Sequence, residues 1–188
     1  MIWNKHLNLE SSHCLFSPSK YSWLNYSDDK ALEVYNNLKK VELGTRLHAW
    51  AKETIELKLR QANRKNNIIY KYINDAIDYR MDPEVLLYFS PYFYGTADAI
   101  SFYKNVLRIH DLKTGDTPAK IDQLRIYAAL FCLEYGQDPF LIKMELRIYQ
   151  ADNVIIDIPN PADIKAIMDK IIHLNDILRK NDEEFMQL

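Results

Sequence analysis

Apolar residues recur at helical spacing in the stretch between residues 41 and 59. Leu43, Leu47 and Trp50 follow one another at steps of four and three, which places them on one face of a helix. The pattern predicts a helix over 41–59 and a second helix over 66–79.

The pattern changes after residue 80, where β-branched and aromatic residues dominate. This composition is typical of strands and predicts five of them, over 85–90, 92–103, 106–113, 140–149 and 154–158. Thr117-Pro118 supplies an N-cap with proline in the first turn, and Gly136 suits a C-terminal cap, so a helix is predicted over 118–135. Pro159 and Pro161 precede an amphipathic stretch that predicts a helix over about 162–180.

The order of these elements predicts an α/β layer fold. The length of 188 residues fits one domain, 1–188, with an irregular lead-in over 1–40 and a C-terminal helix within 159–188. A helix start at Ser17-Pro18-Ser19 interrupts the lead-in.

Composition and charge exclude several classes of protein. With 48% hydrophobic and 27% charged residues, the chain is not a disordered polymer, and no window approaches 18 uncharged apolar residues. We therefore expect no membrane segment and, from the N-terminal residues, no secretory leader. Cys14 and Cys132 cannot form a four-thiolate zinc or iron–sulfur site, and two distant cysteines favour a cytoplasmic location.

The net charge of −2 argues against a general binder of polyanions. The middle of the chain is nevertheless locally basic, because residues 99–127 carry five lysines and arginines against three aspartates. The five are Lys104, Arg108, Lys113, Lys120 and Arg125.

An Asp-x-Lys motif lies at Asp111-Leu112-Lys113. The same spacing also occurs at Asp28/Lys30 and Asp163/Lys165, so the motif alone is not specific. The difference is context: a strand over 106–113 places Asp111 and Lys113 on one face of a sheet.

A tight hairpin would bring a second acid to this motif. If Lys104-Asn105 form a two-residue loop, Tyr103 pairs with Val106 and Asp98 lies opposite Asp111. Two carboxylates so placed would be roughly 5 Å apart and would repel each other unless a divalent cation bound between them. A looser loop, with both acids exposed at strand ends, remains an open alternative.

Four motifs together resemble the PD-(D/E)XK nuclease superfamily, in particular its RecB-type exonucleases, which include CRISPR-adaptation nucleases and many phage exonucleases. The resemblance covers residues 17–150. The motifs are Gly44-Thr45-Arg46-Leu47-His48, Gly95-Thr96-Ala97-Asp98, Asp111-Leu112-Lys113-Thr114-Gly115 and Gln123-Leu124-Arg125-Ile126-Tyr127.

The resemblance implies a restriction-endonuclease-like core, a central mixed β-sheet flanked by helices, and a role for each matching residue. His48, Asp98, Asp111 and the carbonyl of Leu112 would bind the metal. Lys113 would position the attacking water, and Asp98, Asp111 and Lys113 would be the catalytic set. Gln123 and Tyr127 share a helix face that would meet DNA, with Lys120 and Arg125 holding its backbone beside Lys104 and Arg108.

The chain departs from the family pattern at several positions. Ala97 replaces a common proline, and Lys52 stands where relatives often have a glutamate; Glu53 and Glu56 are off that spacing. The cysteines that hold an iron–sulfur cluster in some relatives are missing, so no such cluster is expected.

The sequence thus predicts a Mg²⁺- or Mn²⁺-dependent deoxyribonuclease, an exonuclease rather than an endonuclease, that acts in recombination, repair or phage genome processing. DNA is the expected partner, with a recombination or single-strand-binding protein as a further candidate and no membrane partner. A non-catalytic nucleic-acid-binding or assembly protein with the same fold is the alternative. Cleavage polarity, strand preference and oligomeric state remain open.

Overall fold

The structure is a computed structural model that describes residues 14–62, 67–115 and 117–185. The chain divides into two compact units, one up to Thr45 and one from Arg46 onward. A 3₁₀ segment, η2 (Pro18–Asn25), lies in the first unit, where the Ser17-Pro18-Ser19 start was predicted. The long helix α1 (Asp28–Glu56) begins in the first unit and ends in the second.

The second unit contains a five-stranded mixed β-sheet with helices on both faces. Its strands follow one another in the order β1 (Asp82–Ser90), β2 (Phe93–Tyr103), β3 (Val106–Lys113), β4 (Lys143–Gln150) and β5 (Asn153–Asp157). Only β3 and β4 are parallel, because α3 (Asp122–Glu134) connects them. The predicted α/β class with a central mixed sheet is confirmed.

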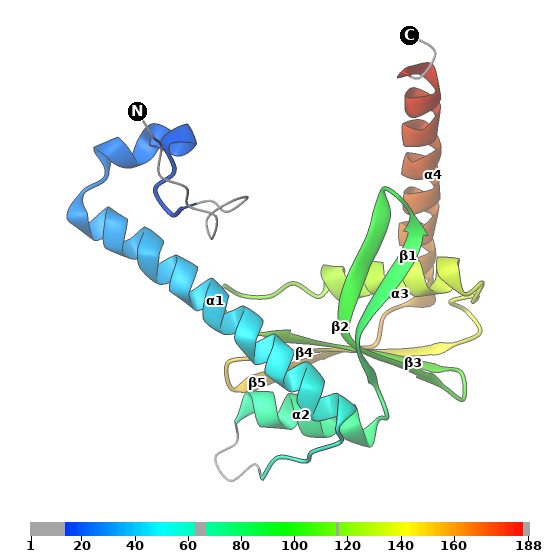
Figure 1. The fold of residues 1–188 in the computed structure, drawn as a ribbon. Helices are drawn as coiled ribbons and strands as arrows, with labels where there is room; N and C mark the ends of the chain where they lie inside the picture. Colours follow the sequence, from blue (N-terminus) through cyan, green and yellow to red (C-terminus); the bar gives the residue numbers. More distant parts are fainter. Residues whose placement is uncertain (1–13, 63–66, 116, 186–188) are drawn as a thin grey trace, which may run out of the picture. The chain divides into compact units, whose positions relative to one another are not determined.

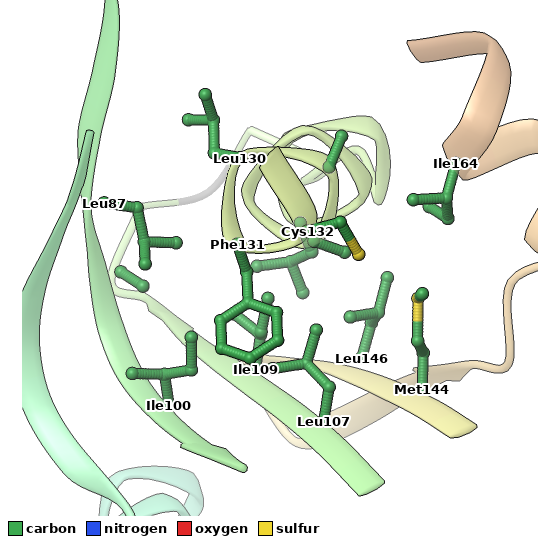
Figure 2. Packing of buried hydrophobic residues seen from close by; sticks show 14 of the residues in the cluster. Leu87, Ile100, Leu107, Ile109, Leu130, Phe131, Cys132, Met144, Leu146 and Ile164 are labelled. Carbon is green, nitrogen blue, oxygen red and sulfur yellow. The ribbon is translucent and has the colours of Figure 1, made fainter. Parts of the chain in front are cut away.

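Each face of the sheet buries a separate apolar core. On one face, α3 and α4 (Pro161–Phe185) cover the strands, and Phe131 and Cys132 of α3 and Ile164 of α4 lie above Leu107 and Leu146, as Figure 2 shows. On the other face, α2 (Ile68–Asp78) packs against β3 and β4 (Figure 1). The period-two alternation of apolar residues in the strands supplies both cores.

The second core joins α2 to the last turns of α1. Ala51 and Ile55 of α1 meet Ile73 of α2 and Tyr149 of β4, all buried. This packing fixes the C-terminal part of α1 against the sheet, and with it the residues around His48.

The hairpin between β2 and β3 has the predicted two-residue loop. Lys104 and Asn105 both have positive φ, 48° and 59°, as a type I′ turn requires. Tyr103 pairs with Val106, and the antiparallel ladder continues to Ala99 and His110. The ladder ends there, immediately before the position where Asp98 would face Asp111.

Helix α1 begins at Asp28, thirteen residues before the predicted start at 41. The Ser27 hydroxyl accepts a hydrogen bond from the Lys30 N–H, and Asp28 and Asp29 place negative charge in the first turn. The prediction missed this start because it followed an apolar stripe, whereas Leu32 of this region is exposed.

Helix α3 begins at Asp122, so the predicted start at Thr117-Pro118 is wrong. The side chain of Gln150, at the end of β4, holds the preceding segment outside the helix. Its Nε2 donates to the carbonyls of Gly115 and Thr117, and its Oε1 accepts from the Ala119 N–H. The predicted cap at Gly136 is confirmed: its φ is 62°, and the next N–H returns to the Cys132 carbonyl.

Among the described residues, no helix combines the length and the apolar character needed to cross a membrane.

Candidate metal and nuclease site

The predicted acidic residues lie where β2 separates from β3. Asp98 is on β2, immediately beyond the last pair of the β2–β3 ladder, and Asp111 and Lys113 end β3. His48 reaches the site from α1. Asp98 also ties the two strands together, because its Oδ2 accepts a hydrogen bond from the Leu112 N–H at 2.8 Å.

Asp98 is held in an environment that opposes its negative charge. Its side chain is only 17% exposed. Burial, followed by the charge of Asp111, raises the pKa of Asp98 to about 6, although His48 and the Leu112 N–H act in the opposite direction. The His48 Nδ1 lies 3.5 Å from the Asp98 Oδ2. A carboxylate in this position would gain from a nearby cation.

Glu84 joins the site, although sequence analysis did not identify it. Ligand atoms of His48, Glu84 and Asp98 all lie within 4.8 Å of one another. Glu84 lies on β1 between the pairs Pro83–Ala99 and Val85–Ala97, which places it opposite Asp98. Its φ of 53° lies in the left-handed region, which is unusual for a glutamate inside a strand.

The strand that carries Glu84 also begins earlier than predicted. We expected a strand from residue 85, whereas β1 starts at Asp82. A longer strand alone would not have placed Glu84 opposite Asp98, because the β1–β2 register shifts between Tyr88 and Ser90 beyond the turn that joins the two strands.

Asp111 and Lys113 form an ion pair at the edge of this group. The Lys113 Nζ lies 3.1 Å from Oδ1 and 3.0 Å from Oδ2 of Asp111, and it donates to the Gln123 Oε1 at 2.9 Å. Asp111 is 3% exposed, and among the described residues its Oδ2 has no partner in hydrogen-bond geometry. The Lys113 ammonium thus lies beside both oxygens of a buried carboxylate, and Oδ2 is held by charge rather than by a well-aligned hydrogen bond.

Gln123 and Tyr127 share a groove on α3. The groove has a volume of about 460 Å³, and both residues line it together with Lys120, Tyr94 and Gly95. The Tyr127 ring lies against Gly95 so closely that a Cβ there would meet it at 3.0 Å. The Gln-x-x-x-Tyr motif therefore contacts the Lys113 amine through Gln123 and lines the surface groove through both of its residues.

Arg125 is not brought to this groove. It makes a two-point ion pair with Asp157 of β5, with nitrogen–oxygen distances of 2.9 and 3.1 Å. Lys104 lies at the β2–β3 turn over the Tyr103 ring, and Arg108 lies over the Tyr79 ring. The predicted basic group therefore occupies several separate places in the described structure.

Glu53 and Glu56 are exposed and do not belong to the group formed by His48, Glu84 and Asp98. Glu56 lies 4.0 Å from the amine of Lys52 on the same helix. The structure thus supplies an acid from β1, rather than from the helix that carries His48.

The residues present fit a divalent cation. One imidazole and two carboxylates converge, the buried carboxylate of Asp111 interacts with that of Asp98, and the mutual repulsion of the acids would fall when a cation bound. The carboxylate oxygens, which outnumber the single imidazole, suit Mg²⁺ and Mn²⁺.

Comparisons with known protein families, curated proteins and solved structures found no match to this chain.

Proposed function

We propose that the protein is a metal-dependent deoxyribonuclease of the PD-(D/E)XK type. The observation that carries the proposal is the convergence of His48, Glu84 and Asp98 beside the Asp111–Lys113 pair. A purely structural acid cluster would be expected on the solvated surface, whereas here Asp98 and Asp111 are largely buried.

Asp98 is the central ligand of the proposed metal site. It is close to both His48 and Glu84, and its charge interacts with that of Asp111. Asp111 and the Leu112 carbonyl would complete the ligand set. A bound Mg²⁺ or Mn²⁺ supplies Lewis-acid stabilisation of the phosphate and makes water a better nucleophile.

Lys113 has the position of a group that orients water and offsets charge on the phosphate. Asp111 and Gln123 hold its amine from two sides, which fixes the amine at the edge of the site. In hydrolysis, water adds to phosphorus, the P–O bond to the leaving oxygen breaks, and that oxygen takes a proton. A fixed ammonium is suited to the charge that develops during this exchange.

The groove on α3 is the proposed path for the DNA strand. Lys120 offers a charge to the backbone, and Tyr127 and Gln123 line the groove, with Gln123 also bonded to the Lys113 amine. We propose exonuclease action, in recombination, repair or phage genome processing, in the cytoplasm.

The test compares linear DNA with relaxed closed circular DNA of the same sequence. We expect Mg²⁺ or Mn²⁺ to support degradation of the linear form, chelation to abolish it, and the circle to survive. Equal loss of both forms would show an endonuclease. DNA retained on a gel in chelator, without degradation of either form when metal is added, would show a non-catalytic nucleic-acid-binding protein and contradict the proposal.

A further inference from the structure

A second pocket lies on the face of the sheet that carries α2, toward the β2–β3 turn. Its volume is about 360 Å³, within the range of small-molecule sites. Ser101 and Arg108 are direct partners in the β2–β3 ladder and both line it, three residues along their strands from Asp98 and Asp111. The pocket is therefore distinct from the acidic site and from the groove on α3.

The guanidinium of Arg108 is held in place by a stacking contact, and its Nε–H donor makes no hydrogen bond among the described residues. Its Cζ lies 4.6 Å from the centre of the Tyr79 ring, a stacking contact that fixes the plane of the group. Its Nε is 3.5 Å from the Glu145 Oε1, and at this distance the Nε forms an ion pair but no hydrogen bond. The same Glu145 oxygen lies 2.9 Å from Arg147, so the two arginines share this carboxylate.

Ser101 adds a buried hydroxyl without a partner. The residue is 7% exposed, and its Oγ has no hydrogen-bond partner among the residues that the structure describes. Buried polar atoms are almost always paired with protein or ordered water, so the hydroxyl of this pocket-lining serine is available for one further hydrogen bond. This observation is independent of the charge on Arg108.

Two arginines and two aspartates line the pocket: Arg80, Arg108, Asp78 and Asp82. Asp78 is paired with Arg60 at 2.9 Å, and Arg108 lies 3.5 Å from Glu145. The pocket therefore offers guanidinium groups in a lining whose charges balance. Lys104 does not line the pocket, but its amine lies over the ring of Tyr103, which does.

From this geometry we infer that the pocket binds the phosphate group of a nucleotide. A guanidinium fork and a hydroxyl donor match phosphate oxygens. Tyr103, 60% exposed, offers an aromatic surface for the sugar and base, which a simple inorganic anion would not use. The phosphate belongs either to a free nucleotide or to a nucleic-acid strand, and the experiment separates the two sources.

The experiment titrates the full chain with deoxyadenosine 5′-monophosphate by calorimetry, with chelator present so that neither metal capture nor cleavage contributes. Deoxyadenosine and inorganic phosphate are titrated in parallel, and so is a short single-stranded oligonucleotide. We expect the nucleotide to bind at one site, more tightly than inorganic phosphate, and deoxyadenosine not to bind.

Arg108→Gln should weaken nucleotide binding about tenfold or more, because a charged hydrogen-bond donor is lost. Ser101→Ala should weaken it several-fold without loss of thermal stability, since an unpaired hydroxyl is removed. The control Arg179→Gln makes the same change as the first variant at an exposed position on α4 and should bind as the parent does.

Binding of the oligonucleotide alone, with the same dependence on Arg108 and Ser101, would assign the phosphate to a strand and would support the inference. No binding of either ligand would overturn it, as would equal affinity of the parent and both pocket variants. Because no measurement depends on metal or cleavage, this outcome is independent of the nuclease proposal.

Discussion

The pKa of Asp98 is shifted by burial and by neighbours in the site that include Asp111, His48 and the Leu112 N–H. Its folded pKa of about 6 lies above the ordinary aspartate value of 3.8, so the metal-free folded protein holds this proton more tightly than the unfolded chain. The stability that Asp98 contributes is therefore complete below about pH 4 and is lost as the pH rises through 6.

Asp98→Asn should stabilise the metal-free protein at pH 8 by about 1–3 kcal/mol, because an amide keeps the Leu112 hydrogen bond without the opposed charge. At pH 4.5 the gain should be much smaller. Thermal melts in chelator at both pH values measure it, with Asp152→Asn in the exposed β4–β5 turn as the control. A gain at pH 4.5 as large as at pH 8 would contradict the assigned environment.

Lys113 is expected to act on the barrier rather than on binding. Lys113→Ala should retain metal and DNA binding but lose about a hundredfold in turnover, the usual effect of removing one positioned charge, about 3 kcal/mol. Lys165→Ala, in the Asp-x-Lys spacing on α4, should leave the rate within about twofold. Single-turnover rates at saturating enzyme measure both. A folded Lys113→Ala variant that cuts at the parent rate would remove Lys113 from the mechanism.

At the residue scale, the sequence predicted the part of the site that a local rule governs. The Lys104-Asn105 turn fixes one register, and the ladder that follows ends at Ala99 and His110, one pair before Asp98 and Asp111. Glu84 could not be predicted in this way, because the register shifts between Tyr88 and Ser90 after the two-residue β1–β2 turn and because Glu84 has a left-handed φ inside a strand. Arg125 was assigned from charge alone, whereas its partner Asp157 is 32 residues away in the sequence.

At the scale of elements, Gln150 determines where α3 begins. It is the β4 partner of Lys113 in the parallel ladder, and its amide holds the segment that leads from Lys113 to Gln123. The local signal at Thr117-Pro118 is a valid helix start, but these distant hydrogen bonds override it. A single sequence does not reveal a contact of this kind.

Gln150→Ala should therefore loosen the segment before α3. We expect a loss of about 1–2 kcal/mol in stability, since the lost hydrogen bonds are partly exposed, and faster hydrogen exchange at the Ala119 amide. Gln137→Ala is the matched control, because that side chain bonds only the neighbouring Tyr135 carbonyl among the described contacts. Unchanged protection of the Ala119 amide in Gln150→Ala would show that other contacts fix the segment.

At the scale of the whole molecule, alternating strands and amphipathic helices were sufficient to predict the layers. The strands that carry the site are covered on both faces because Leu107 and Ile109 face one core while Leu112 faces the other. Between these cores, the end of β3 carries two polar residues, Asp111 and Lys113, that neither core requires. The sheet thus holds the acids in place, and the chemistry depends on what binds there.

The most direct test is the rate of nucleotide release from end-labelled linear DNA as Mn²⁺ is titrated, for the parent and for Asp111→Asn. Asp111→Asn preserves the shape of the buried side chain but removes the charge that would bind the cation. We predict saturable, Mn²⁺-dependent release by the parent and at least a hundredfold lower rate for the folded variant. Release by Asp111→Asn at the parent rate, or by the parent in chelator, would contradict the assignment of this site.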